Sequence, residues 1–128
     1  EFRRVLFRSP RFRDQIALLE VDVVALEMLV LRVLSAEKSG KQSLDIAGLL
    51  KIRGSEMQQR YTELMMLAAG PVTQLYAHEA MEAGWQGDFA GAAAVAPLAG
   101  TYFNMRKTTI YGGSNEVQRN IIAQTVLG

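Results

Sequence analysis

The chain has 128 residues, a formal net charge of +1, 49% hydrophobic residues and no cysteine. This length and apolar content are sufficient for one compact domain with a buried core. The lack of cysteine excludes a disulfide framework and a thiolate nucleophile, and with a single histidine we expect no zinc site. The near-neutral charge also argues against a nucleic-acid surface, which needs a dense basic stripe to displace counterions from phosphates.

The first nine residues differ from the rest of the chain. They run Glu-Phe-Arg-Arg-Val-Leu-Phe-Arg-Ser and hold three arginines against one acid, so they resemble a translated adapter more than a targeting peptide. We therefore expect residues 1–9 to be a non-native extension and residues 10–128 to be the domain. The absence of cysteine is compatible with a cytoplasmic location, which we adopt as an expectation.

Residues 12–38 are predicted to form a long helix. Their apolar positions recur at alternating spacings of three and four, which places them on one stripe of a helix: Ile16, Leu19, Val23, Leu26, Val30 and Val33. Further apolar side chains widen the stripe, so we expect more than one neighbour to cover it. Charged residues interrupt the run from Ile16 to Leu34, and we expect neither a membrane-spanning helix nor a membrane partner.

A second long helix is predicted after the polar residues 39–42. Ser43 can cap it, and the pair Gly70-Pro71 should end it, because proline disfavours a helical residue before it and cannot donate a backbone hydrogen bond. Small residues at Ala47, Gly48 and Gly54 would allow another helix to approach closely.

The last third of the chain reads as shorter pieces. We predict a short helix over 72–82, a glycine-rich loop with an alanine-rich insert over 83–100, and a short helix over 101–109. Gly112-Gly113 breaks the pattern, and Asn115 with Gln118 three residues later predicts the capped start of a final helix through Val126. These elements indicate an all-α fold, most simply an up-down-up-down four-helix bundle.

The two glycines before the last helix are the most distinctive local feature. Glycines let a ligand approach the backbone closely, and the exposed N–H groups at a helix start favour an anionic or acceptor-rich ligand, such as a pyrophosphate or the edge of a flavin. A plain connector between two helices has the same pattern. Physical reasoning alone therefore leaves both interpretations open.

A resemblance favours the ligand. The stretch from Arg106 to Gly128, which contains Thr-Ile-Tyr-Gly-Gly-Ser-Asn-Glu-Val-Gln-Arg-Asn, is similar to the closing signature of the acyl-CoA dehydrogenase family. The run from Leu49 to Glu56 also resembles the helical domain of that family, and the likeness extends loosely from Arg13 to the end. Only the closing signature is specific.

The resemblance implies a domain that packs behind FAD, with Gly113, Ser114 and Glu116 matching the positions that lie along the cofactor. Ser114 would offer a hydroxyl and Glu116 an acceptor. Their ordinary roles as turn glycine, helix cap and first-turn acid are compatible with this. The family dehydrogenates acyl-CoA thioesters and passes electrons to an electron-transferring flavoprotein, and its members assemble as homo- or hetero-oligomers.

The chain departs from the family at Gly112. Many members carry the carboxylate base at this position, and glycine has no side chain that could accept a proton. The base then lies on an earlier helix or on a partner subunit, or the parent protein is a non-catalytic relative in which this domain is a helical oligomerisation module. The isolated segment is expected to be inert in either case.

Two further groups of polar residues could have a function. His78 with Glu79 could be imagined as an acid-base pair, but consecutive residues point to different faces of a helix, so a surface or packing histidine is favoured. Arg106 could contact a phosphate of FAD or CoA, although a solvated helix face is the ordinary interpretation.

Overall fold

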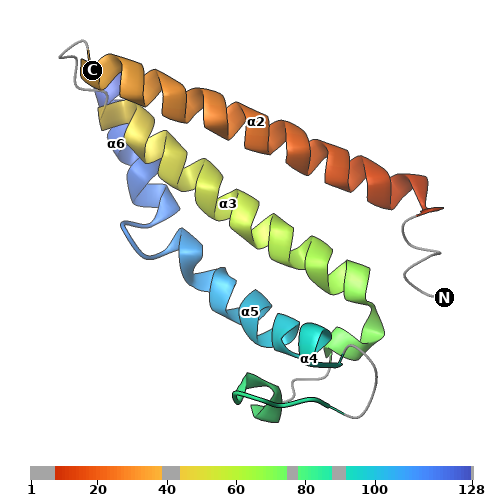
Figure 1. The fold of residues 1–128 in the computed structure, drawn as a ribbon. Coiled ribbons are helices and arrows are strands. Elements are labelled where there is room, and N and C mark those ends of the chain that lie inside the picture. Colours follow the sequence, from red (N-terminus) through yellow and green to blue (C-terminus); the bar gives the residue numbers. More distant parts are fainter. Residues whose placement is uncertain (1–7, 39–43, 75–77, 88–91, 128) are drawn as a thin grey trace.

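The computed structural model describes residues 8–38, 44–74, 78–87 and 92–127, and within them every regular element is a helix (Figure 1). Three α-helices carry the architecture: α2 (Pro10–Lys38), α3 (Leu44–Ala69) and α6 (Asn115–Leu127). Shorter elements connect α3 to α6: the 3₁₀ turns η1 (Pro71–Gln74) and η2 (His78–Met81), the helices α4 (Ala92–Val95) and α5 (Pro97–Met105), and η3 (Arg106–Thr109). The predicted all-α class is confirmed.

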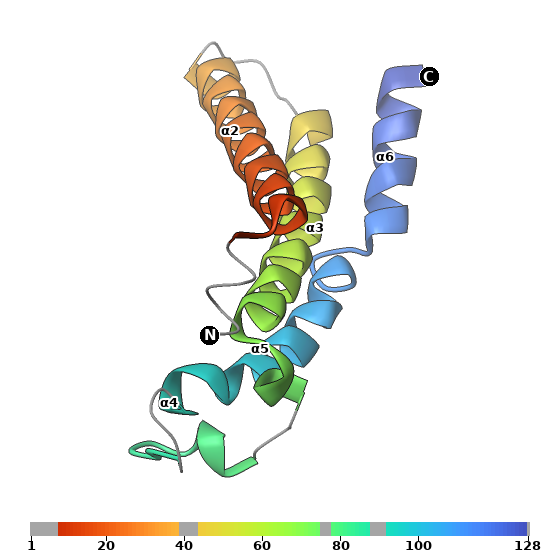
Figure 2. The ribbon, with the colours of Figure 1, turned by 90° about the vertical axis from the view of Figure 1, so that its right-hand side faces the viewer.

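Helix α3 is the centre of the fold. Helix α2 packs against it in the opposite direction, and α5, η3 and α6 follow one another along another side of it (Figures 1 and 2). The predicted up-down-up-down order of four helices is not confirmed, because α5 and α6 run end to end as one broken row. They do not form two antiparallel helices.

The two long helices end where the sequence predicted. Gly70 adopts a φ of 83° directly after α3, a left-handed conformation that glycine tolerates and that commonly terminates helices. The Thr73 hydroxyl then donates to the carbonyl of Gly70 at 2.8 Å and so ties η1 to the end of α3. The predicted Ser43 cap and the linker 39–42 lie outside the described residues.

The connecting segment differs from the prediction in two places. Residues 72–82 were expected to form one short helix, but the described part forms the two 3₁₀ turns, with Thr73 N bonded to Gly70 O and Glu82 N bonded to Glu79 O. Residues 83–100 were expected to form a loop, yet α4 and the first part of α5 lie there. Alanine has the highest helix propensity, and Pro97 occupies the first turn of α5, where its missing N–H costs nothing.

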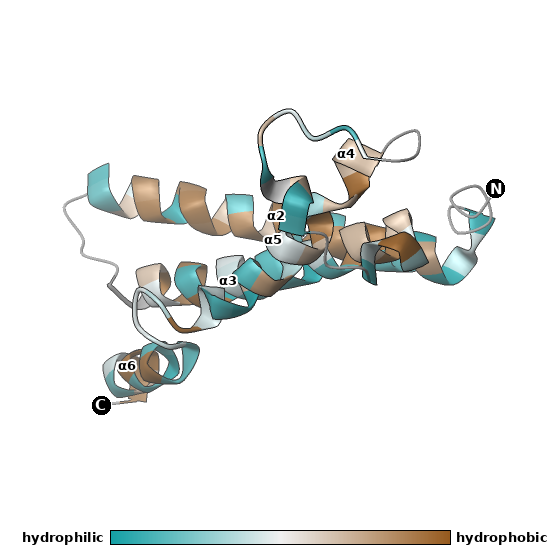
Figure 3. Cartoon of the chain, turned by 90° about the horizontal axis from the view of Figure 1, so that it is seen from below, coloured by the Kyte–Doolittle hydropathy of each residue, from teal (hydrophilic) through white to brown (hydrophobic). Residues whose placement is uncertain are grey.

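The hydrophobic core lies between α2 and α3. Phe12, Leu19 and Leu64 are buried together, with Ile16 and Met57 packed against them. The predicted stripe on α2 is only partly covered, since Val23 and Val30 remain 38% and 41% exposed. Figure 3 shows hydrophobic bands along α2, and a second set of its apolar side chains is open to solvent: Leu18, Val21, Val24, Met28, Leu31 and Leu34.

No helix in the described ranges is long and apolar enough to cross a membrane.

Candidate functional site

The glycine turn joins η3 to α6 and stands on the surface. Gly112 and Gly113 have φ values of 69° and 86°, both in the left-handed region that side chains rarely adopt. Two consecutive residues of this kind separate η3 from α6 by a sharp local turn. A side chain at either position would strain the backbone, which explains why glycine is required here by the geometry alone.

The space around the two glycines differs. A Cβ atom at Gly112 would meet nothing within 4 Å, whereas one at Gly113 would lie 2.7 Å from Nε2 of Gln118. Gln118 itself reaches back to the turn and donates to the carbonyl of Gly112 at 3.3 Å. Gly112 therefore faces open space, and Gly113 faces the first turns of α6.

Ser114, and not Asn115, caps the last helix. The amide of Val117 donates to the Ser114 hydroxyl at 3.3 Å, and the first helical hydrogen bond runs from the Gln118 amide to the Ser114 carbonyl at 2.9 Å. This is the geometry of an N-cap residue. The predicted capping pair of Asn115 and Gln118 is wrong, because the Asn115 side chain points into the protein. The role of helix cap that the sequence also gave to Ser114 is confirmed.

Glu116 lies fully exposed in the first turn of α6. A hydrogen bond from its own backbone N–H lowers the pKa of its carboxyl below its ordinary value, and a hydrogen bond with Ser114 lowers it further. The charges of Arg119 and Lys51 act in the same direction. The carboxylate is therefore held ionised, as a hydrogen-bond acceptor at the helix N-terminus.

Apolar side chains stand on both sides of the turn. Ile110 and Tyr111 precede it with 68% and 54% of their surface exposed, and Val117 follows it, also exposed. The resulting surface combines open apolar groups, two glycines without side chains and the donor end of a helix. A planar, partly apolar ligand with polar edges fits this combination.

The turn is fastened to α3 by a buried polar cluster that the sequence analysis missed. The Lys51 ammonium donates to the carbonyl of Thr109 at 3.1 Å and to Oδ1 of Asn115 at 2.7 Å. The Ser55 hydroxyl lies 3.2 Å from the same oxygen. Asn115 and Ser55 are only 3% and 6% exposed, so this is a polar core beside the apolar one. The resemblance of Leu49–Glu56 to the family pointed at this segment but not at its role.

Arg106 has a structural role that differs from both interpretations made from the sequence. Its guanidinium pairs with Glu63 at 2.8 Å, donates to the carbonyl of Gln59 at 2.9 Å and stacks over the ring of Tyr102 at 4.4 Å. It therefore ties η3 to α3 and does not form a solvated face. His78 and Glu79 are exposed on η2, which belongs to a different segment of the chain from Arg106 and Lys51.

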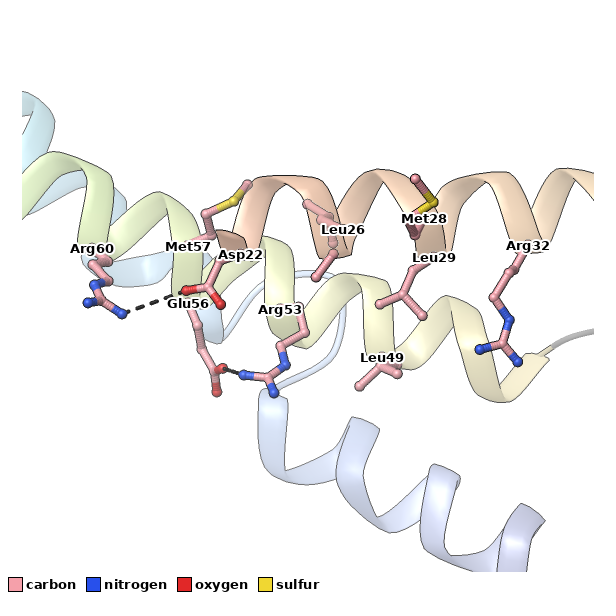
Figure 4. A pocket seen from close by; sticks show the side chains of 11 residues that line it. Asp22, Leu26, Met28, Leu29, Arg32, Leu49, Arg53, Glu56, Met57 and Arg60 are labelled. Carbon is pink, nitrogen blue, oxygen red and sulfur yellow. Dashed lines mark ion pairs between the residues drawn. The ribbon is translucent and has the colours of Figure 1, made fainter. Parts of the chain in front are cut away.

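Another groove lies away from the turn, between α2 and α3. It encloses about 540 Å³ and has an apolar floor, with the ion pairs Arg60–Asp22 at 3.6 Å and Arg53–Glu56 at 3.8 Å along it (Figure 4). A smaller pocket of about 320 Å³ borders the glycine turn and is lined in part by Lys51, Tyr111 and Gly112. Of these two, the smaller one lies nearer the predicted site because it reaches Gly112, but Gly113, Ser114 and Glu116 do not line it.

These features define an all-α domain whose last helix presents a capped N-terminus behind a double-glycine turn. The family described as acyl-CoA dehydrogenase, C-terminal domain, matches residues 1–127. The chain belongs to this family.

Two curated relatives share a short and strongly similar segment with the chain. Both are named acyl-CoA dehydrogenase IpdE1, one from Mycobacterium tuberculosis and one from Mycolicibacterium smegmatis. Each is 70% identical over 27 residues, which is 21% of this chain and 7% of the relative. The aligned segment thus spans a small fraction of these relatives. No solved structure matches the chain.

Proposed function

We propose that the chain is the C-terminal part of an FAD-dependent acyl-CoA dehydrogenase and that its glycine turn and the start of α6 lie along the flavin. Gly113 would allow close approach to the backbone, Ser114 would contribute its hydroxyl, and Glu116 would accept a hydrogen bond. When bound, FAD would supply the acceptor for the hydride that leaves the β-carbon of the acyl-CoA.

The observation that carries this proposal is the exposed geometry of the turn. Two left-handed glycines, open apolar neighbours and a helix N-terminus coincide at the segment that resembles the family signature. A simple connector would not need an exposed apolar margin. The family membership supports an oxidoreductase parent.

The dehydrogenation needs a base for the α-proton, and the turn does not provide one. Gly112 has no side chain. Glu116 is unsuited to the role, because its lowered pKa makes it a weaker base than an ordinary glutamate. We propose that the base comes from an earlier helix of the parent or from a partner subunit, and that the isolated segment is inactive.

The remaining expectations belong to the parent protein. We propose that it takes an acyl-CoA substrate, donates electrons to an electron-transferring flavoprotein, works in the cytoplasm and assembles as a homo- or hetero-oligomer. A four-helix bundle would then be completed in the assembly. The open apolar surface of α2 supports burial against further protein.

The test is flavin binding by the parent with Gly113 replaced by valine. We expect this variant to lose most of its bound FAD and its acyl-CoA-dependent bleaching, both read from flavin absorbance. The matched control is Gly84→Val, because Gly84 has a φ of 85° and nothing within 4 Å of its Cβ position, so it carries the same backbone strain away from the turn.

The alternative function is a helical oligomerisation module in a non-catalytic relative. The absence of a side chain at Gly112 favours it. Under this alternative the wild-type parent binds no flavin, or both glycine variants retain it equally. Either result would reject the proposed flavin contact.

A further inference from the structure

Lys51 occupies a position that the turn depends on. One ammonium contacts the carbonyl of Thr109, which precedes the turn, and the side chain of Asn115, which follows it. The two acceptors lie six residues apart in the chain and on opposite sides of the two glycines. Lys51 therefore holds both ends of the turn on the same turn of α3.

The chemistry of the contact fixes the orientation of Asn115. An ammonium group only donates hydrogen bonds, so the Asn115 atom that faces it at 2.7 Å must be the amide oxygen. At 3% exposure, Asn115 cannot replace this partner with bulk water. The first residue of α6 is thereby held in one orientation, and the direction of the N–H groups beside it is held as well.

The turn needs such an external constraint. Glycine residues have the largest conformational freedom of any residue, and two in succession leave the path of the chain poorly specified by local sterics. Within the turn itself, the described ties are weaker: Tyr111 N to Lys107 O at 3.3 Å and Gln118 Nε2 to Gly112 O at 3.3 Å. Thr108 adds a buried anchor just before the turn, where its hydroxyl donates to the carbonyl of Met105 at 2.8 Å.

We infer that Lys51 is a positioning residue for the ligand site at the glycine turn. Its ammonium joins the two ends of the turn and so aims the N-terminus of α6 at the ligand, without contacting the ligand itself. This inference rests on the proposed function for the identity of the ligand, which is FAD. Helix α3 thereby takes part in ligand binding, although it lies outside the closing signature.

The first measurement uses the 128-residue chain and needs no flavin. Lys51→Met should raise the hydrogen-exchange rates of the Val117 and Gln118 amides, which bond to Ser114, at least tenfold, while amides in the middle of α2 stay unchanged. Lys51→Arg should keep most of the protection, because it retains a cationic donor. The control is Arg53→Met, which removes a positive charge from the same helix at a side chain that is 64% exposed.

The second measurement uses the parent and its affinity for FAD, followed by flavin fluorescence. We expect Lys51→Met to weaken FAD binding at least tenfold and Lys51→Arg to restore most of it, with the unfolding temperature of each variant recorded alongside. A merely structural lysine would lower the unfolding temperature and leave the affinity of the folded fraction unchanged. That outcome, or unchanged exchange at the Val117 and Gln118 amides, overturns the inference.

The two proposals fail separately. If Gly113→Val weakens FAD binding and Lys51→Met does not, the flavin contact stands and the role of Lys51 is wrong. If neither substitution affects FAD, the flavin contact itself is wrong. Should Lys51→Met fail to fold, Lys51→Gln, which keeps a neutral donor, replaces it in both measurements with the same expected direction.

Discussion

Two sides of α3 are held by different forces. On the side of α2 the contact is apolar and closes only at one end, around Phe12, Leu19 and Leu64, while the other end opens into the 540 Å³ groove. On the side of η3 and α6 the contact is polar, with Asn115 buried and Lys51 half-buried beside it. Apolar contacts tolerate small shifts, whereas a buried polar cluster is satisfied in one register only. The stability of this domain and the precise position of its glycine turn therefore depend on different sides of α3.

The apolar side should dominate stability. Leu64→Ala removes a side chain that is 8% exposed in the centre of the core, and we expect the free energy of unfolding to fall by about 2–5 kcal/mol. Urea denaturation followed by circular dichroism measures it. Leu67→Ala, on the same helix and 50% exposed, should change stability by less than about 0.5 kcal/mol. Equal losses would mean that the core lies elsewhere.

The polar side should rank second. Asn115→Leu keeps a similar volume but leaves the Lys51 ammonium without its nearest acceptor, so we expect a loss of about 1–3 kcal/mol. The same denaturation experiment applies, with Asn120→Leu at an exposed position of α6 as the control. A loss no larger than that of the control would show that the buried cluster contributes nothing net.

The surface ion pair between α3 and α6 should contribute less. Glu56 and Arg119 lie 2.7 Å apart, but their side chains are 39% and 55% exposed. A double-mutant cycle with Glu56→Gln and Arg119→Gln should give a coupling of about 0.2–1 kcal/mol. It should shrink further in 1 M salt. A coupling insensitive to salt would contradict the solvent-exposed geometry.

The smallest effect is expected at Glu116 and depends on pH. Because the pKa of Glu116 is lower in the folded chain than the ordinary value of a glutamate, ionised Glu116 stabilises the fold at pH values above that ordinary value. This contribution is lost as pH falls through the folded pKa. The stability difference between the wild-type chain and Glu116→Gln should therefore narrow on acidification, measured by thermal unfolding. If the stability difference between the wild-type chain and Glu116→Gln stayed constant from neutral to acidic pH, the lowered pKa of Glu116 would be wrong.

Local patterns predicted most of the helices. The three-four spacing of apolar residues located α2, and Gly70-Pro71 located the end of α3, since both signals depend on residues close in sequence. The segment over 83–100 was predicted wrongly because its glycines outweighed the alanines beside Pro97. The end-to-end arrangement of α5 and α6 could not be predicted from hydrophobic periodicity. Periodicity shows that one face of a helix is apolar, but not which helix packs against that face.

The candidate site was only half visible in the sequence. The glycines, Ser114 and Glu116 stand next to one another and could be singled out together. Lys51 and Asn115 are 64 residues apart, so their contact depends on how α6 docks on α3. Asn115 was predicted as a cap because asparagine favours that role. In the structure its side chain is buried and bonded to Lys51, and Ser114 caps the helix.

Photolabelling can show whether the glycine turn forms part of the wall of a flavin site. The parent is loaded with an azido derivative of FAD, irradiated and digested with trypsin, which cuts after Lys107 and Arg119 and releases residues 108–119 as one peptide. We expect the label within this peptide, and we expect an excess of unmodified FAD to prevent the labelling. Competable label confined to other peptides, with none in residues 108–119, would contradict it.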